Sequence, residues 1–167
     1  MNNVLSYREA NLNDAQELIR LGLLSYGQFK DVLGDSGWKR MSHNIGNEEK
    51  LLELLSISKC FVCMDGSKMI GMAHIIPSGN PWEMFKAEWS YIRMVGVDPA
   101  YGGKGIAQSL TGMCIAHARN LNEKTIVLHT SEFMDAARHI YEKAGFKKTE
   151  ELEPRFGKRY WLYKLEL

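Results

Sequence analysis

Two kinds of hydrophobic period alternate along this chain. Residues 90–97 and 125–130 are short and largely apolar, which is typical of buried β-strands. Residues 106–120 instead carry apolar side chains at spacings of three and four, which predicts a long amphipathic helix. A helix with the same spacing is predicted to end at Gly145, because glycine readily adopts the left-handed conformation that closes many helices.

Four further segments are predicted as strands: residues 5–9, 60–64, 68–76 and 159–166. The second and third of these form a predicted hairpin that turns at Asp65-Gly66. Asn13 is predicted to cap a helix, with Gln16 as its capping-box partner. Asn47 is predicted to cap another helix.

Residues 25–46 show no clear hydrophobic period, so irregular structure is expected there, and a charged segment with Pro154 and Gly157 leads to the last predicted strand. Elsewhere strands and helices interleave without an internal repeat, which predicts a mixed α/β protein. At 167 residues, the chain is predicted to be a single domain over residues 1–167.

Composition and charge narrow the class of protein. The formal net charge is +1, whereas proteins that bind nucleic acid through electrostatics are usually clearly basic. No apolar run approaches the roughly 18 residues of a membrane span, and residues 1–10 do not resemble a signal peptide. The three cysteines, Cys60, Cys63 and Cys114, are expected to be buried thiols rather than metal ligands. We therefore expect a cytoplasmic protein with no nucleic-acid partner, no membrane partner and no metal site.

The segment between the strand at 90–97 and the helix at 106–120 contains three glycines and a lysine: Gly102, Gly103, Lys104 and Gly105. Such a turn leaves backbone N–H groups free at the positive end of a helix, where they bind anions. The segment is not a P-loop, because Gly103-Lys104 is followed by Gly105 and not by Ser or Thr. The third glycine of a dinucleotide fingerprint is replaced by Gln108. A phosphate or pyrophosphate site is predicted, and a tight connection without a ligand is the alternative.

Two stretches resemble motifs of the GNAT family of N-acetyltransferases. Residues 97–107 resemble its motif A, with Gly105 and Ala107 at the last two fixed positions and Gly102 where Arg or Gln is usual. Residues 137–146 read Ala-Arg-His-Ile-Tyr-Glu-Lys-Ala-Gly-Phe and resemble its motif B, with Met134 at the position of the usual Asn. The resemblance implies a single-domain GNAT-like α/β fold. Its sheet is expected to be mixed and mostly antiparallel, with about six to seven strands flanked by about four helices.

The resemblance also implies an activity. Members of the family transfer the acetyl group of acetyl-coenzyme A, here a co-substrate, to an amine, so the expected acceptor is a small-molecule or peptide amine. A non-catalytic acyl-coenzyme A-binding module of the same fold is the alternative. Family members often dimerise, so a homodimer is possible. The implied cofactor-binding residues are Met94, Val95, Gly96, Val97, Gly102, Gly103, Lys104, Gly105, Ile106, Ala107, Met134 and Tyr141.

The resemblance implies that Tyr141 protonates the leaving thiolate, or is a packed core tyrosine if it has no catalytic role. The position of the family's usual glutamate base is occupied by Tyr91. Glu88 is therefore the first candidate base, with His129 and a water chain as alternatives. Five aromatic residues are expected to contact the acceptor: Trp38, Trp82, Phe85, Trp89 and Tyr91.

Overall fold

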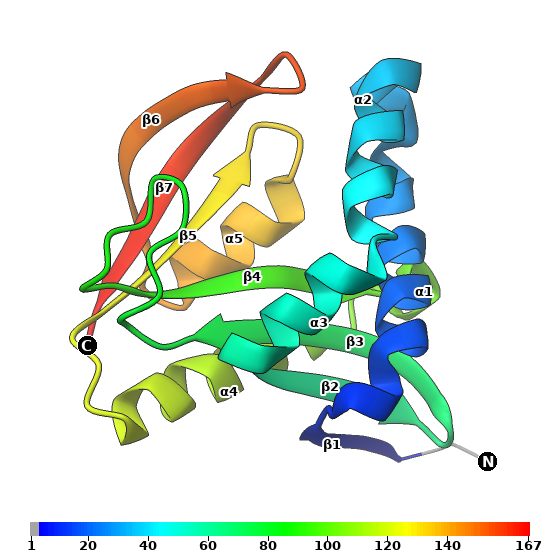
Figure 1. The fold of residues 1–167 in the computed structure, drawn as a ribbon, viewed down its shortest axis with the longest axis horizontal. Helices are drawn as coiled ribbons and strands as arrows, with labels where there is room; N and C mark the ends of the chain where they lie inside the picture. Colours follow the sequence, from blue (N-terminus) through cyan, green and yellow to red (C-terminus); the bar gives the residue numbers. More distant parts are fainter. Residues whose placement is uncertain (1–3) are drawn as a thin grey trace.

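The computed structural model describes residues 4–167, so residues 1–3 of the predicted domain lie outside the described residues. Seven strands form one mixed sheet in the order β1-β2-β3-β4-β5-β7-β6 (Figure 1). The strands are β1 Leu5–Glu9, β2 Lys59–Asp65, β3 Lys68–Ile76, β4 Ser90–Val97, β5 Thr125–Ser131, β6 Lys147–Arg155 and β7 Lys158–Glu166. All neighbours pair antiparallel except β4 and β5, which pair parallel. This confirms the predicted α/β fold and its mostly antiparallel sheet.

Five α-helices flank the sheet within residues 4–167, where about four were expected. They are α1 Ala15–Tyr26, α2 Lys30–Ile45, α3 Glu48–Ile57, α4 Ile106–Asn120 and α5 Asp135–Lys143. Alternate residues of β3 pack on opposite faces: Met72 joins the apolar cluster of α1, and Ala73 joins that of α4. Helices therefore cover both faces of the sheet. In the described part of the chain, no helix is both long and apolar enough to cross a bilayer.

Residues 30–45 form helix α2, which corrects the prediction of irregular structure there. The sequence signal is weak because the helix contains Gly34, whose left-handed φ of 72° kinks it. Leu33, Gly37 and Met41 are buried, so tertiary packing compensates for a poor local helix propensity.

The charged segment before the last predicted strand forms strand β6, residues 147–155, for which no strand was specifically predicted. Phe156 and Gly157 both have positive φ values, 53° and 69°, and together make the two-residue turn of a hairpin with β7. Pro154 is tolerated because β6 is an edge strand whose register shifts between Leu152 and Arg155. The exposed, charged face of this strand concealed its period in the sequence.

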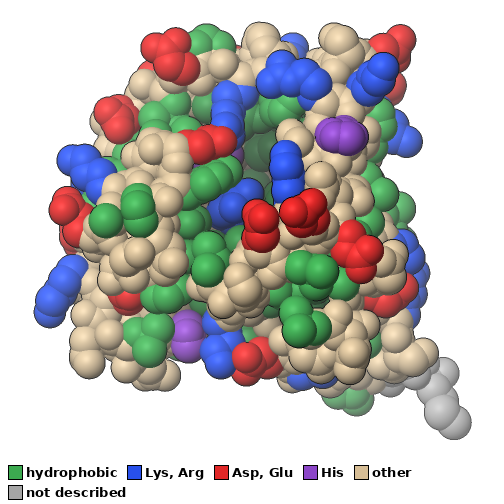
Figure 2. Space-filling model, viewed as in Figure 1, with side chains coloured by type: hydrophobic (Ala, Val, Ile, Leu, Met, Phe, Trp, Pro, Cys, Tyr) green, Lys and Arg blue, Asp and Glu red, His purple; other side chains and the backbone are tan. Residues whose placement is uncertain are grey.

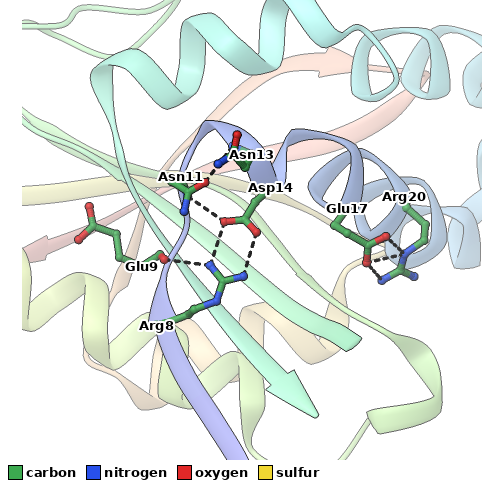
Figure 3. Close-up of polar contacts among 7 residues, drawn as sticks. All are labelled: Arg8, Glu9, Asn11, Asn13, Asp14, Glu17 and Arg20. Carbon is green, nitrogen blue, oxygen red and sulfur yellow. Dashed lines mark hydrogen bonds and ion pairs between the residues drawn. The ribbon is translucent and has the colours of Figure 1, made fainter. Parts of the chain in front are cut away.

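The first helical segment begins at Asn11 and not at the predicted Asn13 (Figure 3). The Asn11 side chain accepts the N–H of Asn13 at 2.9 Å, and the Asp14 carboxylate accepts the N–H of Asn11 at 2.9 Å. Arg8 donates to both oxygens of Asp14 at 2.8 Å. The reciprocal capping box therefore uses Asp14 in place of Gln16, and Arg8 ties it to strand β1.

Asp14→Ala is expected to lower the free energy of unfolding at pH 7 by about 1 kcal/mol, because it removes the cap and the Arg8 pair. The hydrogen bond from Arg8 lowers the pKa of Asp14, so the carboxylate stabilises the folded state above its ordinary pKa of about 4. The decrease in the free energy of unfolding should become smaller as the pH falls through the lowered pKa of Asp14. Urea titrations at pH 7 and pH 3 measure this, with Glu17→Ala, which breaks only the exposed Arg20 pair, as the control. An equal loss at both pH values would contradict the argument.

Candidate active site

Strands β4 and β5 separate soon after they start. Within residues 4–167, their parallel pairing is confined to Ser90 with Ile126 and Tyr91 with Val127. Figure 1 shows the two strands diverging beyond that point. A cavity of about 1070 Å³ opens beside them, lined by both strands, by α1 to α3 and α5, and by the turn between β6 and β7. Figure 2 shows this face of the molecule hollowed, with hydrophobic side chains in the hollow and Lys and Arg side chains around it.

Strand β4 contains a bulge at the point where it leaves β5. Its register with β3 shifts so that Met94 and Val95 have no partner in that ladder. Met94 has a φ of 54°, a left-handed conformation that costs a bulky residue free energy. A bulge of this kind re-aims backbone groups, and here it turns residues 94–97 toward the cavity that they line.

Two backbone groups of this segment already have partners within the chain. The Tyr26 hydroxyl donates to the Val95 carbonyl at 3.3 Å, and the Val97 N–H donates to the Ser25 hydroxyl at 3.1 Å. Both partners come from α1, which packs against β4 at Gly96. A Cβ at Gly96 would lie 3.1 Å from the Ser25 hydroxyl oxygen, so a larger residue would push this helix away.

The glycine-rich turn leads into the N-terminus of α4. Gly103 and Gly105 have φ values of 77° and 76°, and an added Cβ at either would meet nothing within 4 Å. The Gly102 amide donates to the Pro99 carbonyl at 3.2 Å, and the next amide of the described chain to find a backbone acceptor is that of Ser109, which donates to Gly105. The amides of residues 103–108 therefore have no acceptor within residues 4–167 and lie at the positive end of a 15-residue helix. Lys104 lies over the Tyr101 ring at 5.0 Å and is exposed.

Tyr141 lies in the last turn of α5 and lines the cavity. The sequence fixes its position through the helix end: the Phe146 N–H donates to the Tyr141 carbonyl at 3.0 Å, and the Gly145 N–H to the Glu142 carbonyl at 3.1 Å. The Phe146 ring also contacts the Tyr141 ring edge-on at 5.9 Å. Burial raises the pKa of Tyr141 well above its ordinary value, so its hydroxyl keeps its proton at neutral pH. Met134, just before α5, also lines the cavity.

Aromatic rings form the wall of the cavity farther along β4 and β5. Trp82 stacks on Tyr91 at 6.2 Å and on His129 at 5.9 Å. The Arg93 guanidinium lies 3.7 Å from the centre of the Trp82 ring. Trp82, Tyr91, Arg93 and His129 all line the cavity, so this wall is both aromatic and cationic.

His129 is held neutral in this wall. Arg155 lies 3.3 Å from His129 Nε2 and, as an obligate donor, fixes that nitrogen as the acceptor. Arg155 also forms an ion pair with Glu83. Burial, followed by the charges of Arg155 and Arg93, lowers the pKa of His129 to about 3. Because its acceptor nitrogen is occupied, His129 is poorly suited to act as a base.

The structure does not bring all the predicted site residues together. Glu88 is exposed, lies before the first residue of β4 and is absent from the cavity lining. Phe85 and Trp89 are buried in an apolar cluster behind the wall, and Trp38 packs near Lys30 instead. Of the predicted cofactor-binding residues 102–107, Ala107 lines the cavity and residues 102–106 do not. Among the described residues, no group of three His, Cys, Asp or Glu side chains is placed to hold a metal ion.

Six charged residues line the cavity and were not anticipated: Arg40, Lys50, Glu53, Glu83, Arg93 and Arg155. Arg93 did leave a signal, because it interrupts an otherwise uncharged strand and lies two residues after Tyr91, on the same face. Glu83 and Arg155 are 72 positions apart in the chain, and only the folding of β6 against β7 brings them together.

Comparison with known proteins agrees with this architecture. The model of the acetyltransferase (GNAT) family matches residues 35–146. A mycothiol acetyltransferase of Cellulomonas flavigena is 38% identical over 73 residues, which are 44% of this chain and 20% of that protein. N-acetyltransferase 8B of Homo sapiens is 29% identical over 97 residues, which are 58% of this chain and 42% of that protein. The matched parts thus span less than half the length of these curated relatives.

Solved structures share the whole fold. The PaiA N-acetyltransferase of Thermoplasma acidophilum, solved in complex with coenzyme A, superposes with a TM-score of 0.80 at 14% identity. The superposition covers 98% of this chain and 99% of that one. The family model, in turn, covers about two thirds of the sequence and includes the glycine-rich turn and Tyr141. The chain belongs to the acetyltransferase (GNAT) family.

Proposed function

We propose that the protein is an acetyl-coenzyme A-dependent N-acetyltransferase that acts on an amine of a small molecule or peptide. The observation that carries this proposal is the position of Tyr141, a protonated phenol on the cavity at the opening between β4 and β5. The family assignment and the coenzyme A complex of the PaiA enzyme support the choice of co-substrate.

The chain offers separate groups for the parts of coenzyme A. The amides of residues 103–108 and the positive end of α4 would bind the pyrophosphate. Residues 94–97 would face the pantetheine arm, because β4 has left β5 there. The exposed Lys104 would add a positive charge beside the pyrophosphate.

The proposed reaction forms a C–N bond and breaks a C–S bond. The neutral amine attacks the thioester carbonyl, and the backbone N–H near Val95 stabilises the oxyanion that develops. Collapse of this intermediate releases the thiolate, which takes its proton from the Tyr141 hydroxyl. The amine nitrogen loses one proton to water in the cavity, and this proton restores the Tyr141 hydroxyl. We assign the base role to water, because Glu88 lies outside the lining and His129 has its acceptor nitrogen occupied.

The test is acetyl transfer to a panel of amines. Purified protein is incubated with acetyl-coenzyme A, and free thiol and acetylated product are followed together. We expect transfer to at least one class of amine. Binding of coenzyme A by calorimetry, without transfer or hydrolysis, would instead favour a non-catalytic acyl-coenzyme A-binding module. Absence of coenzyme A binding would overturn both assignments.

A further inference from the structure

Arg93 lies in the cavity without a carboxylate partner. Within residues 4–167, its guanidinium makes no ion pair and no side-chain hydrogen bond. The guanidinium carbon lies over the face of the Trp82 ring, 3.7 Å from the ring centre. An arginine in the middle of a strand, partly withdrawn from water, normally finds a carboxylate or another acceptor. The free guanidinium edge is therefore available to a ligand.

The charges around Arg93 do not neutralise it. Glu83 is the acidic residue whose charge acts on Arg93, but it already forms an ion pair with Arg155. Burial has the largest effect and lowers the pKa of Arg93, whereas Tyr91, Glu83 and Tyr26 raise it and Arg155 lowers it. Arg93 keeps its positive charge at neutral pH, because the ordinary pKa of a guanidinium exceeds 12. The charged residues that line the cavity are Arg40, Lys50, Arg93 and Arg155 against Glu53 and Glu83. The cavity thus carries an excess of positive charge, and the unmatched charge in its aromatic wall is Arg93.

We propose that the acceptor is a small amine that also carries a carboxylate, and that Arg93 binds this carboxylate beside Trp82. The proposal rests on the proposed function and names its acceptor class. A guanidinium presents two parallel N–H groups that match the two oxygens of a carboxylate. A single guanidinium without an ion-pair partner is neutralised by one negative charge, and a carboxylate supplies that charge at neutral pH.

The position of Arg93 sets the size of the acceptor. Val95 follows Arg93 by two residues across the bulge of β4, and two residues of chain span at most about 7 Å. A carboxylate on Arg93 and an amine at the thioester near Val95 therefore fit within one small molecule, such as an amino acid. Trp82 and Tyr91 would cover an apolar substituent of this molecule, since their stacked rings line the same wall. A polyamine would instead place cations beside Arg93 and Arg155.

The first experiment compares acceptors that differ in one group. A set of free amino acids is tested against the matching amino acid amides, with a linear diamine as the cationic probe. We expect KM to be lower for the acids by on the order of 10-fold to 100-fold, since a hydrogen bond to a charged group is worth that much. Equal use of acids and amides, or preference for the diamine, would overturn the proposal.

The second experiment removes the guanidinium. Arg93→Gln should abolish the preference for acids over amides and leave KM for acetyl-coenzyme A unchanged. Arg93→Lys, which keeps a positive charge, should retain part of that preference. Arg119→Gln removes the same charge from the exposed end of α4 and is the matched control. Melting temperatures check folding, which is expected to hold because Arg93 has no ion pair to lose. An undiminished preference for acids in Arg93→Gln would overturn the proposal.

A binding measurement keeps this site separate from the reaction. Calorimetry on the complex with coenzyme A compares N-acetyl amino acids, which are the expected products, with their amides. Tighter binding of the acids that is lost in Arg93→Gln supports the carboxylate site even if no transfer occurs, and in that case the proposed activity fails alone. Transfer to amines with no difference between acids and amides in binding leaves the activity standing and overturns the site.

Discussion

Tyr141→Phe is expected to lower kcat by on the order of 10²-fold, because it removes the proposed proton donor and keeps the ring. The Tyr141 ring packs on Phe146 and the residue is 7% exposed, so removing the ring would disturb the end of α5. The Tyr141 hydroxyl, in contrast, has no hydrogen-bond partner among the described residues. The donor matters most as the C–S bond breaks and the sulfur becomes a thiolate. Coenzyme A affinity should therefore change much less than kcat. Steady-state kinetics and calorimetry measure the two quantities.

Tyr163→Phe is the matched control for this prediction. Tyr163 is a buried core tyrosine outside the cavity lining, and its hydroxyl donates to Glu142 at 2.9 Å. Its loss is expected to lower the free energy of unfolding by about 1 kcal/mol and to leave kcat unchanged. If kcat of Tyr141→Phe stays within about twofold while chemistry limits the rate, Tyr141 only packs the core and water is the acid.

Gly105→Asp is expected to weaken coenzyme A binding by on the order of 100-fold, because it places a carboxylate among amides that would hold the pyrophosphate. The space beside Gly105 is open, so the side chain is accommodated without a clash. The φ of 76° is strained for any residue with a Cβ, but Asp and Asn tolerate this region better than most. Calorimetric titration with coenzyme A measures the effect.

Gly105→Asn separates charge from shape in this turn. Asn carries the same backbone strain and nearly the same volume as Asp, without the negative charge. We expect it to bind coenzyme A several-fold more weakly than the unchanged protein but far more tightly than Gly105→Asp. The difference should shrink at high salt, since exposed charges are screened. Unchanged affinity in a folded Gly105→Asp variant would remove this turn from the coenzyme A site.

The sequence by itself determined the elements with strong local signals. Asp65-Gly66 predicted the β2–β3 hairpin, and the glycines at 103 and 105 predicted the turn into α4. Gly145 and Phe146 predicted the end of α5 and, with it, the position of Tyr141. These features depend on φ values and hydrogen bonds within a few residues, so neighbouring residues are sufficient to specify them.

Only the tertiary structure decided the parts that depend on distant partners. Helix α2 and strand β6 are weak in the sequence because packing and pairing stabilise them, not local propensity. The same holds for the acceptor wall. Glu88 precedes β4 and lies outside the cavity lining, and the β6–β7 hairpin brings Arg155 to Glu83 and His129. Whether Arg93 has a carboxylate partner depends on which side chains fold around it, and no local pattern in β4 records that.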